Sequence, residues 1–426
     1  MKKSLVLAMA MALGVTASAY AANPFSDVPA GHWAYDSISK LAAAGVIEGY
    51  GDDTFRGDRL MTRYEMAQIV AKAMAKGANV DKLAAEFADE LDKLNVRVAA
   101  LEKKSDNVKI TGQFRYHYAH NKINLKDAES TSNHSNALRS RIWFTGQVND
   151  NWNYVGMLQN YQDLTDNAGN EGTNFQRAYL DGRLGGVIVR AGRHDFQLGD
   201  ANLYDNRMDG IKISYGDKVK FGAYYGKPTD HEYSNGILGD DIEVKYDRFF
   251  GANVGAEIGK FSLNVAYDKF KDAYTYKKGA KDQDYSNNLD NNGVFSVQAK
   301  YNFGKASLDA IFLKSDIDTD KNNFIANGAS TKGVVVTASY GGAEAAKVGS
   351  WGLVGKYYNQ GVGTFVAHTM NGGAQDFIRE GFKGYSLAGY VTVAKNMVAG
   401  LEWYDLKGKE SDNKEKTLWS ELVVSF

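Results

Sequence analysis

Hydrophobic residues are spaced in two different ways along the chain, and the change falls near residue 108. Before it, apolar residues recur every three or four positions, as on one face of a helix. This spacing joins Ile38 to Leu41, and Met66 to Ile69 and Val70. After it, apolar and polar residues alternate in many segments, as on strands with one apolar face. The pattern predicts a helical part before residue 108 and a β-rich part after it.

The alternation in residues 108–426 is clearest at 261–267, 295–303 and 418–426. A soluble β-sandwich could alternate in the same way. The expected connections favour a membrane barrel instead, because short turns alternate with long polar loops, as in outer-membrane barrels. Short turns are expected at 149–151, 185–186, 216–217, 304–305 and 395–396. Long loops are expected at 119–137, 164–173, 194–207, 228–241, 271–292, 315–331, 360–381 and 407–415.

Aromatic and proline positions support the same choice. Membrane barrels carry aromatic residues at both interfaces with water. Aromatic residues expected near strand ends are Tyr215, Tyr267, Tyr301, Phe303, Tyr340 and Trp403. The three prolines, Pro24, Pro29 and Pro228, all lie outside the expected strands, so no strand lacks a backbone donor at a proline.

We therefore predict a mainly β chain, in which a transmembrane antiparallel barrel of about 16 strands spans residues 108–426. The segment 242–258 is ambiguous, because Gly251 and Gly255 are compatible with a bend. With an even number of strands, both ends of the barrel lie on the side of the short turns. In outer-membrane barrels that side is the periplasm.

Composition and the first residues indicate the cellular compartment of the protein. Residues 1–21 have a basic start, an apolar stretch and the small residues Ala19 and Ala21, which is typical of a cleaved signal peptide. Without Lys2 and Lys3 the chain has 48 basic and 51 acidic residues, a net charge of −3. This balance gives no indication of nucleic-acid binding. There is no cysteine, hence no disulfide and no thiolate metal site.

Residues 77–107 are expected to form a helical connector. Ala84, Phe87, Leu91 and Leu94, followed by 98 and 101, have the 3,4 spacing of a heptad seam with charged residues between them. The pattern favours a short coiled coil between copies of the chain. A single helix that packs on the N-terminal module is the alternative.

The N-terminal module, residues 22–76, contains a series of short motifs. Phe25-Ser26-Asp27-Val28 precedes a Trp-Ala pair at Trp33, and a turn with Gly49 and a Thr-Phe pair follows. A Thr-Arg-Tyr-Glu box then begins at Thr62. Thr62 and Glu65 also fit a helix capping box, which has a purely structural role.

These motifs resemble the S-layer homology (SLH) domain in order and spacing, although Asp53 and Gly57 replace the Gly and Pro that the family usually has. The resemblance implies binding of cell-wall carbohydrate, in some bacteria a polyamine-modified peptidoglycan. It places ligand contacts at Asp27, Trp33, Gly49, Arg63 and Glu65. For Trp33 the alternative is a core position. SLH domains often act in threes, so the single copy here implies a homotrimer.

A barrel of 16 strands leaves a water-filled lumen. The alternation turns six arginines into it: Arg115, Arg139, Arg141, Arg177, Arg183 and Arg190. The third long loop carries Asp195, Asp200 and Asp205. The barrel resembles general porins, in which the third loop folds inward and faces a basic wall, and this implies a constriction with a transverse field. Alternatively, the arginines are solvated residues with carboxylate neighbours such as Asp181.

Catalytic motifs for hydrolysis and phosphate binding are absent, and the acidic run at Asp316 lacks the glycine and glutamate of a calcium loop. We therefore expect no enzyme activity, no cofactor and no metal. The chain as a whole resembles OmpM-like porins with an SLH domain. The resemblance implies an outer-membrane channel for small hydrophilic solutes, in contact with lipid and tethered to peptidoglycan by a periplasmic SLH domain. The alternatives are a plugged barrel that only anchors the membrane and an S-layer protein with a soluble β-rich body.

Overall fold

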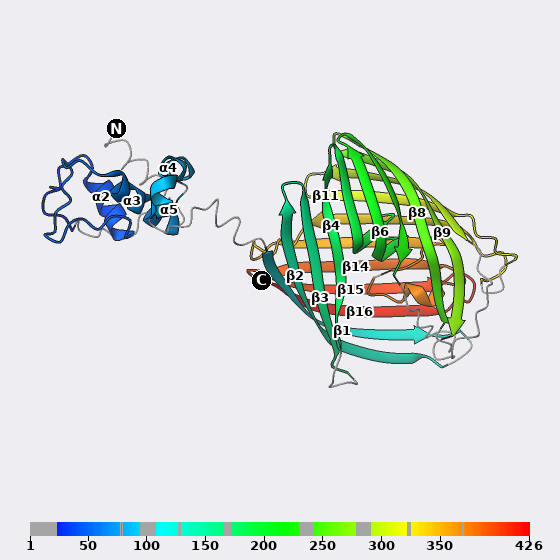
Figure 1. The fold of residues 1–426 in the computed structure, drawn as a ribbon. Coiled ribbons are helices and arrows are strands. Elements are labelled where there is room, and N and C mark those ends of the chain that lie inside the picture. Colours follow the sequence, from blue (N-terminus) through cyan, green and yellow to red (C-terminus); the bar gives the residue numbers. More distant parts are fainter. Residues whose placement is uncertain are drawn as a thin grey trace. The chain divides into compact units, whose positions relative to one another are not determined.

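A computed structural model describes residues 24–76, 78, 80–93, 108–126, 129–165, 172–229, 242–277, 291–321, 325–368 and 370–426 (Figure 1). The chain divides after Asn107 into two compact units, each of which is described by itself.

The N-terminal unit is a small helical module. Its helices are α2 (Tyr35–Ala43), α3 (Arg63–Ala75), α4 (Asp81–Glu86) and α5 (Ala88–Lys93). The apolar faces predicted for the first two meet in a core that includes Ile38, Leu41 and Val70. The predicted capping box is confirmed, since the Thr62 side chain accepts from Glu65 N and the Glu65 side chain accepts from Thr62 N. No described helix is long and apolar enough to cross a membrane.

The connector differs from one continuous helix. Residues 81–93 form two short helices that meet at Phe87. Ala84 and Leu91, which belong to the heptad pattern, are buried in the core of the N-terminal module. In a single chain, these apolar residues therefore pack on the N-terminal module. This is the alternative to a coiled coil that the sequence left open. The remaining seam positions, Leu94, Val98 and Leu101, lie outside the described residues.

The second unit is a closed antiparallel barrel of 16 strands, which confirms the predicted fold class. The first eight strands are β1 (Val108–Asn124), β2 (Thr131–Asn149), β3 (Trp152–Asp163), β4 (Thr173–Leu184), β5 (Val187–Leu198), β6 (Tyr204–Gly216), β7 (Val219–Pro228) and β8 (Ile242–Ile258). The others are β9 (Phe261–Lys277), β10 (Asn292–Phe303), β11 (Ala306–Ser315), β12 (Lys332–Gly341), β13 (Trp351–Gln360), β14 (Phe382–Ala394), β15 (Met397–Gly408) and β16 (Lys414–Ser425).

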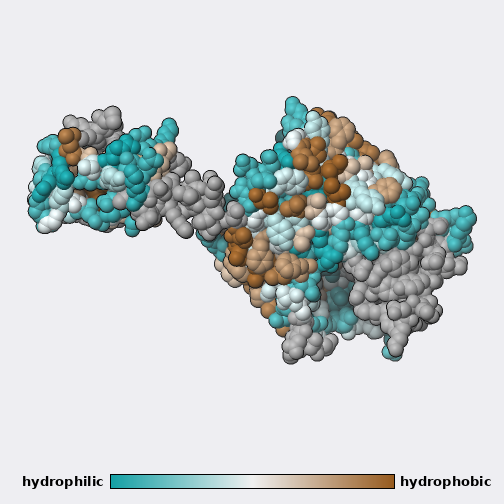
Figure 2. Space-filling view, viewed as in Figure 1, coloured by the Kyte–Doolittle hydropathy of each residue, from teal (hydrophilic) through white to brown (hydrophobic). Residues whose placement is uncertain are grey.

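Alternation places apolar side chains on the outer surface of the barrel (Figure 2). On β6, for example, Ile211, Ile213 and Tyr215 are exposed, while Lys212 between them contacts the ring of Phe196. All six aromatic residues expected near strand ends are exposed. An apolar outer surface over a fully paired backbone is the arrangement that a lipid bilayer requires.

The barrel closes between its first and last strands. β1 pairs with β16 from Gln113↔Ser425 to Asn124↔Lys414. The terminal Phe426 exchanges two backbone hydrogen bonds with Gly112, of 2.7 and 2.9 Å. Both ends of the barrel therefore lie on the edge that carries the short turns, as expected.

Several strands extend further than predicted. β1 continues to Asn124 and β2 begins at Thr131 inside the expected loop 119–137, and β9 continues to Lys277 inside the expected loop 271–292, because the strands run on through polar sequence. The expected loop 194–207 is reduced to 199–203. The segment 242–258, which the sequence left ambiguous, forms one strand, since Gly251 and Gly255 lie inside β8 and are paired with β7 without a shift in register.

Candidate functional site

The hairpin between β5 and β6 leaves the barrel wall and crosses the lumen. Pairing of β4 with β5 ends at Ala178↔Arg193, and pairing of β6 with β7 ends at Met208↔Pro228. Residues 194–207, the inner hairpin, therefore pair with neither neighbouring strand of the wall. At its tip, a Cβ added to Gly199 would lie 3.1 Å from Ile311 Cδ1 on β11. Since β11 is five strands away from β6 around the barrel, the tip has reached a distant part of the wall.

The inner hairpin has one apolar and one polar face. Register pairs put Phe196, Tyr204 and Met208 on the face that is buried in an apolar cluster. Asp195 and Arg207 are paired on the opposite face. The hairpin therefore presents charge to one side of the lumen and packs its apolar side against the other.

A second segment, residues 361–381, also folds inward. It contains the short 3-10 helix η1 (Ala374–Phe377) and runs beside the hairpin tip. Val366 N donates to Leu203 O at 2.7 Å, and Asp205 N donates to Ala367 O at 2.8 Å. Tyr204 and Ala367 form a parallel β-bridge. We call residues 361–381 the inner segment.

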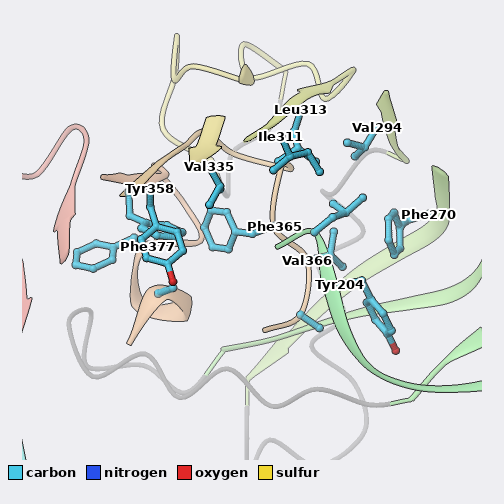
Figure 3. Close-up of a cluster of buried hydrophobic side chains, with 14 of the residues drawn as sticks. Tyr204, Phe270, Val294, Ile311, Leu313, Val335, Tyr358, Phe365, Val366 and Phe377 are labelled. Carbon is cyan, nitrogen blue, oxygen red and sulfur yellow. The ribbon is translucent and has the colours of Figure 1, made fainter. Parts of the chain in front are cut away.

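The two inward elements share one apolar cluster with the barrel wall (Figure 3). Its residues come from both elements and from the eight strands β8 to β15, and most are almost fully buried. They include Phe196, Leu203, Tyr204, Phe249, Phe270, Val294, Ile311, Leu313, Val335, Tyr358, Phe365, Val366, Phe377, Phe382 and Leu406. At roughly 1.5–3 kcal/mol for each large side chain removed from water, this packing fixes the inward positions of both elements.

The opposite side of the lumen is basic. Arg139 donates to Gln113 Oε1 at 3.0 Å, and Arg141 donates to Gln159 Oε1 at 2.7 Å. Arg115 lies 3.6 Å from a carboxylate oxygen of Glu421. Arg139 is directly opposite Arg115 in the β1–β2 register, so like charges are held side by side.

The inner hairpin meets this basic wall through an ion pair. Arg177 Nε donates to Asp195 Oδ1 at 2.7 Å. Arg207, on the same hairpin face, hydrogen-bonds Gln176. Sequence reasoning missed Arg207, because it placed residues 194–207 in a polar loop. The available signal was an acidic and a basic residue two positions apart, Asp205 and Arg207, which alternation places on the same face of a strand.

The other predicted pore residues lie apart from this contact. Arg190 forms an ion pair with Asp181 at 3.0 Å, and Arg183 is exposed near a short turn. Asp205 accepts a hydrogen bond from Gln197 at 3.0 Å, and Asp200 lies at the hairpin tip with a φ of 50°. The nine predicted residues thus divide between a meeting point at Arg177 and Asp195 and more distant parts of the lumen.

In the N-terminal module, Asp27 and Gly49 shape one turn. Asp27 accepts hydrogen bonds from Phe55 N and Arg56 N, both at 2.6 Å. Gly49 has a φ of 67°, and an added Cβ would lie 2.3 Å from the Phe25 ring. Asp53 also has a positive φ, of 57°, which accounts for the glycine usual there in SLH domains.

Arg63 and Glu65 also have partners inside the module. Arg63 Nε donates to Glu90 Oε1 at 2.7 Å and Nη1 donates to Glu86 Oε1 at 3.0 Å, while its guanidinium lies over the Phe87 ring. Arg63 thus fastens α4 and α5 to α3. Glu65 caps α3 and lies 3.2 Å from Arg59.

Trp33 is 55% exposed. The alternative that it is a core residue is therefore wrong. Its ring is therefore accessible at the surface of the module.

The pH dependence of the N-terminal module follows from its carboxylates. Hydrogen bonds lower the pKa of Asp27 (from Phe55 N), of Glu65 (from Thr62 N) and of Glu90 (from Arg63). Hydrogen bonds from the Thr54 and Arg56 side chains lower the pKa of Asp52 to about 2. Because these carboxylates have lower pKa values in the folded than in the unfolded chain, they stabilise the module at pH values above their ordinary pKa values of 3.8 and 4.5. This stabilisation is lost as the pH falls through the folded pKa values.

We therefore expect the unfolding temperature of the module to fall between pH 4.5 and pH 2, measured in the full chain by proteolysis on heating. Asp27→Asn should weaken this dependence. An unfolding temperature that stays constant over that range would contradict the assignment.

The fold and the motifs define a class of protein: a 16-stranded barrel of the transmembrane type joined to a small SLH-like module. Residues 24–67 match the S-layer homology domain family. The N-terminal unit therefore contains an SLH domain. The resemblance to SLH porins is confirmed in these two parts.

Curated relatives match about a fifth to a quarter of the chain. The outer membrane protein SlpA of Thermus thermophilus is 38% identical over 123 residues, which are 24% of this chain and 13% of that protein. SlpA of Deinococcus radiodurans is 40% identical over 124 residues, 24% of this chain and 11% of that protein. Outer membrane protein alpha of Thermotoga maritima is 39% identical over 87 residues, 19% of this chain and 20% of that protein. The chain thus spans only a small part of these relatives.

Solved porins are similar to the barrel at low sequence identity. OmpF of Salmonella typhi has 13% identity and a TM-score of 0.48, over 76% of this chain and 99% of the porin. The anion-selective porin of Comamonas acidovorans has 15% identity and a TM-score of 0.47, over 75% of this chain and 99% of the porin.

Proposed function

We propose that this chain is a homotrimeric outer-membrane porin that lets small hydrophilic solutes diffuse through its barrel and tethers the membrane to peptidoglycan through its SLH domain. The observation that carries the channel is the lumen itself: a charged hairpin face opposite a basic wall, with Asp195 half exposed. Water and ions have access to Asp195, as a diffusion pathway requires.

The location and orientation rest on three supports. The apolar outer surface suits a bilayer, and relatives that match part of the chain are named outer membrane proteins. Both ends of the barrel lie on the edge of the short turns, which is periplasmic in outer-membrane barrels. An SLH domain joined at Val108 is then on the side where peptidoglycan lies.

The trimer rests on the single SLH copy and on the heptad pattern of the connector. Conductance in planar bilayers, together with the mass of the purified oligomer, tests the channel and its assembly. We expect three conducting steps per inserted particle and a mass of three chains.

A plugged barrel that serves only as an anchor is the second candidate. The apolar cluster in the lumen favours it, because the cluster occupies space that would otherwise hold water. The absence of any conductance from pure, folded oligomer would establish this alternative over the porin.

We propose that Trp33 contacts the wall ligand, and that Asp27, Gly49, Arg63 and Glu65 hold the site in shape. Aromatic faces stack on sugars and on alkyl-ammonium groups such as those of polyamines. Trp33→Ala should weaken peptidoglycan pull-down at least about tenfold, equivalent to about 1.4 kcal/mol, without a change in unfolding temperature. Leu60→Ala, at a 79% exposed position, is the control. Equal binding by both variants would remove Trp33 from the site.

A further inference from the structure

The lumen wall carries opposite charges on its two sides. Arg115, Arg139 and Arg141 face inward from β1 and β2. Carboxylates face inward from β9, β11, β15 and β16. These are Asp268, Asp309, Glu402 and Glu415, which are 2, 6, 6 and 3% exposed. The acidic side is therefore covered, whereas the half-exposed Asp195 and its arginine partner mark the open side.

The inner segment covers Glu402 and Glu415. Asn371 Nδ2 donates to Glu402 Oε2 at 2.9 Å. A Cβ added to Gly373 would lie 1.8 Å from Glu415 Oε2, so the backbone there lies directly on the carboxylate. Asp376 lies close enough to the same Glu415 side chain for the two groups to interact. The segment thus lies on the part of the wall where β15 and β16 are acidic.

The inner hairpin covers the remaining two carboxylates. Its tip residue Asp200 lies close enough to Asp309 for their charges to interact. Phe196 packs on the ring of Tyr224 at 4.5 Å, and the Tyr224 hydroxyl donates to Asp268 at 2.9 Å. The hairpin therefore lies over the acidic positions of β9 and β11.

The inner segment is fastened at both ends. Gln360 Nε2 donates to Asn202 O at 3.0 Å, at the hairpin tip. Near the other end, Glu380 accepts hydrogen bonds from the backbone N–H groups of Glu410 and Ser411, both at 2.6 Å. Together with the bridge to Tyr204, these contacts make the segment and the hairpin one unit.

Three partly buried arginines on the other side of the lumen have neutral hydrogen-bond partners. Arg139, Arg141 and Arg207 donate to neutral glutamine side chains. Within the part of the chain that the structure describes, no carboxylate forms an ion pair with any of these three guanidinium groups. A permeating anion meets unneutralised positive charge along this path, and a cation is repelled.

We propose that the inner segment makes the channel anion-selective, because it covers the acidic side of the lumen and leaves the arginine-lined side open to small carboxylate and inorganic anions. The proposal rests on the proposed porin function and specifies its substrate class.

The test is the reversal potential of the full-length protein in planar bilayers under a potassium chloride gradient. In the test variant a short Asn-Gly turn replaces residues 362–380. The wall can close without them, because Gln360 and Phe382 are a register pair. We expect the unchanged channel to prefer chloride. The variant should conduct more and lose about threefold in its chloride-to-potassium permeability ratio.

The outcomes separate the two proposals. A silent unchanged protein would refute the porin function itself. A conducting unchanged protein that prefers potassium would overturn the selectivity proposal, and so would a variant whose permeability ratio is the same as that of the unchanged channel.

A second measurement needs no deletion. The chain has no cysteine, so a single introduced thiol is a unique reporter. Glu415→Cys should react with a water-soluble cationic thiol reagent at least about tenfold more slowly than Asp195→Cys, because Glu415 is 3% exposed and the Asp195 side chain is 51% exposed. Equal rates would show that the acidic side is open, and would overturn the proposal even if the shortened variant fails to fold.

Discussion

A channel with Arg139→Glu and Arg141→Glu is expected to prefer cations, with its chloride-to-potassium permeability ratio lowered about fiftyfold. The two substitutions change four unit charges beside the path. At about 7 Å in water each unit contributes about 0.6 kcal/mol, and salt at 0.1 M screens about half of this. The remaining 1.2 kcal/mol or so acts with opposite sign on chloride and on potassium, which is about sevenfold for each ion and about fiftyfold for their ratio. Reversal potentials in bilayers measure it directly.

The matched control is Arg56→Glu with Arg59→Glu, which makes the same charge change in the SLH domain. It should leave the permeability ratio unchanged. If the lumen variant behaved like this control, the arginines of β2 would not line the ion path.

Gly49→Val is expected to abolish peptidoglycan binding while conductance remains normal. A β-branched residue at a φ of 67° is strained, and its Cβ would overlap the Phe25 ring and approach Thr54 O within 2.8 Å. Strain and overlap together cost about 3 kcal/mol or more, which is comparable with the total stability of so small a module.

Gly51→Val is its control, because nothing lies within 4 Å of a Cβ added at Gly51. It should bind peptidoglycan like the unchanged protein. Proteolysis of residues 24–76 and single-channel conductance, measured on the same preparation, separate loss of the module from loss of the barrel. Normal wall binding by Gly49→Val would contradict the role given to this turn.

The strands were predictable because a barrel wall between lipid and water imposes strict alternation, as at 261–267 and 295–303. Their ends were less so. A polar stretch that suggested a loop includes His120, Lys122 and Ser132. In the structure, however, His120 and Lys122 lie on β1 and are paired with β2, which carries Ser132. Beyond the bilayer both faces of a strand meet water, so the alternation that marks a strand disappears while the hydrogen bonds continue.

The inward fold of residues 361–381 was the least predictable feature of the lumen. Polarity and length identify an outer loop but not the direction in which it folds. The signal was present in Phe365-Val366-Ala367 and Phe377-Ile378, since apolar pairs of this kind have little reason to occur in a loop surrounded by water. Their partners, such as Tyr204 and Ile311, are far away in sequence, so only the tertiary structure brings them together.

In the SLH domain, the sequence identified the motif residues but did not predict the contacts that they make. Conventional spacing located Arg63 and Asp27, whereas their partners Glu86, Glu90 and the Phe55 backbone have no fixed place in a motif. The exposure of Trp33 was open for the same reason, because a single aromatic residue in a helical module suits a core or a surface equally well.

The contact of Arg63 with Glu86 and Glu90 has a mechanical consequence if the chain links membrane and wall. α4 and α5 lie at the end of the module that leads toward Val108, so they are the first elements that tension would detach. Their exposed ion pairs resist this by only about 0–1 kcal/mol each, beside the burial of Ala84 and Leu91. Unwinding their residues 81–93 from about 1.5 Å to about 3.5 Å per residue would lengthen the link by about 26 Å. Breaking and re-forming the ion pairs would then release and recover this extra length reversibly. The distance between membrane and wall could increase without loss of the attachment.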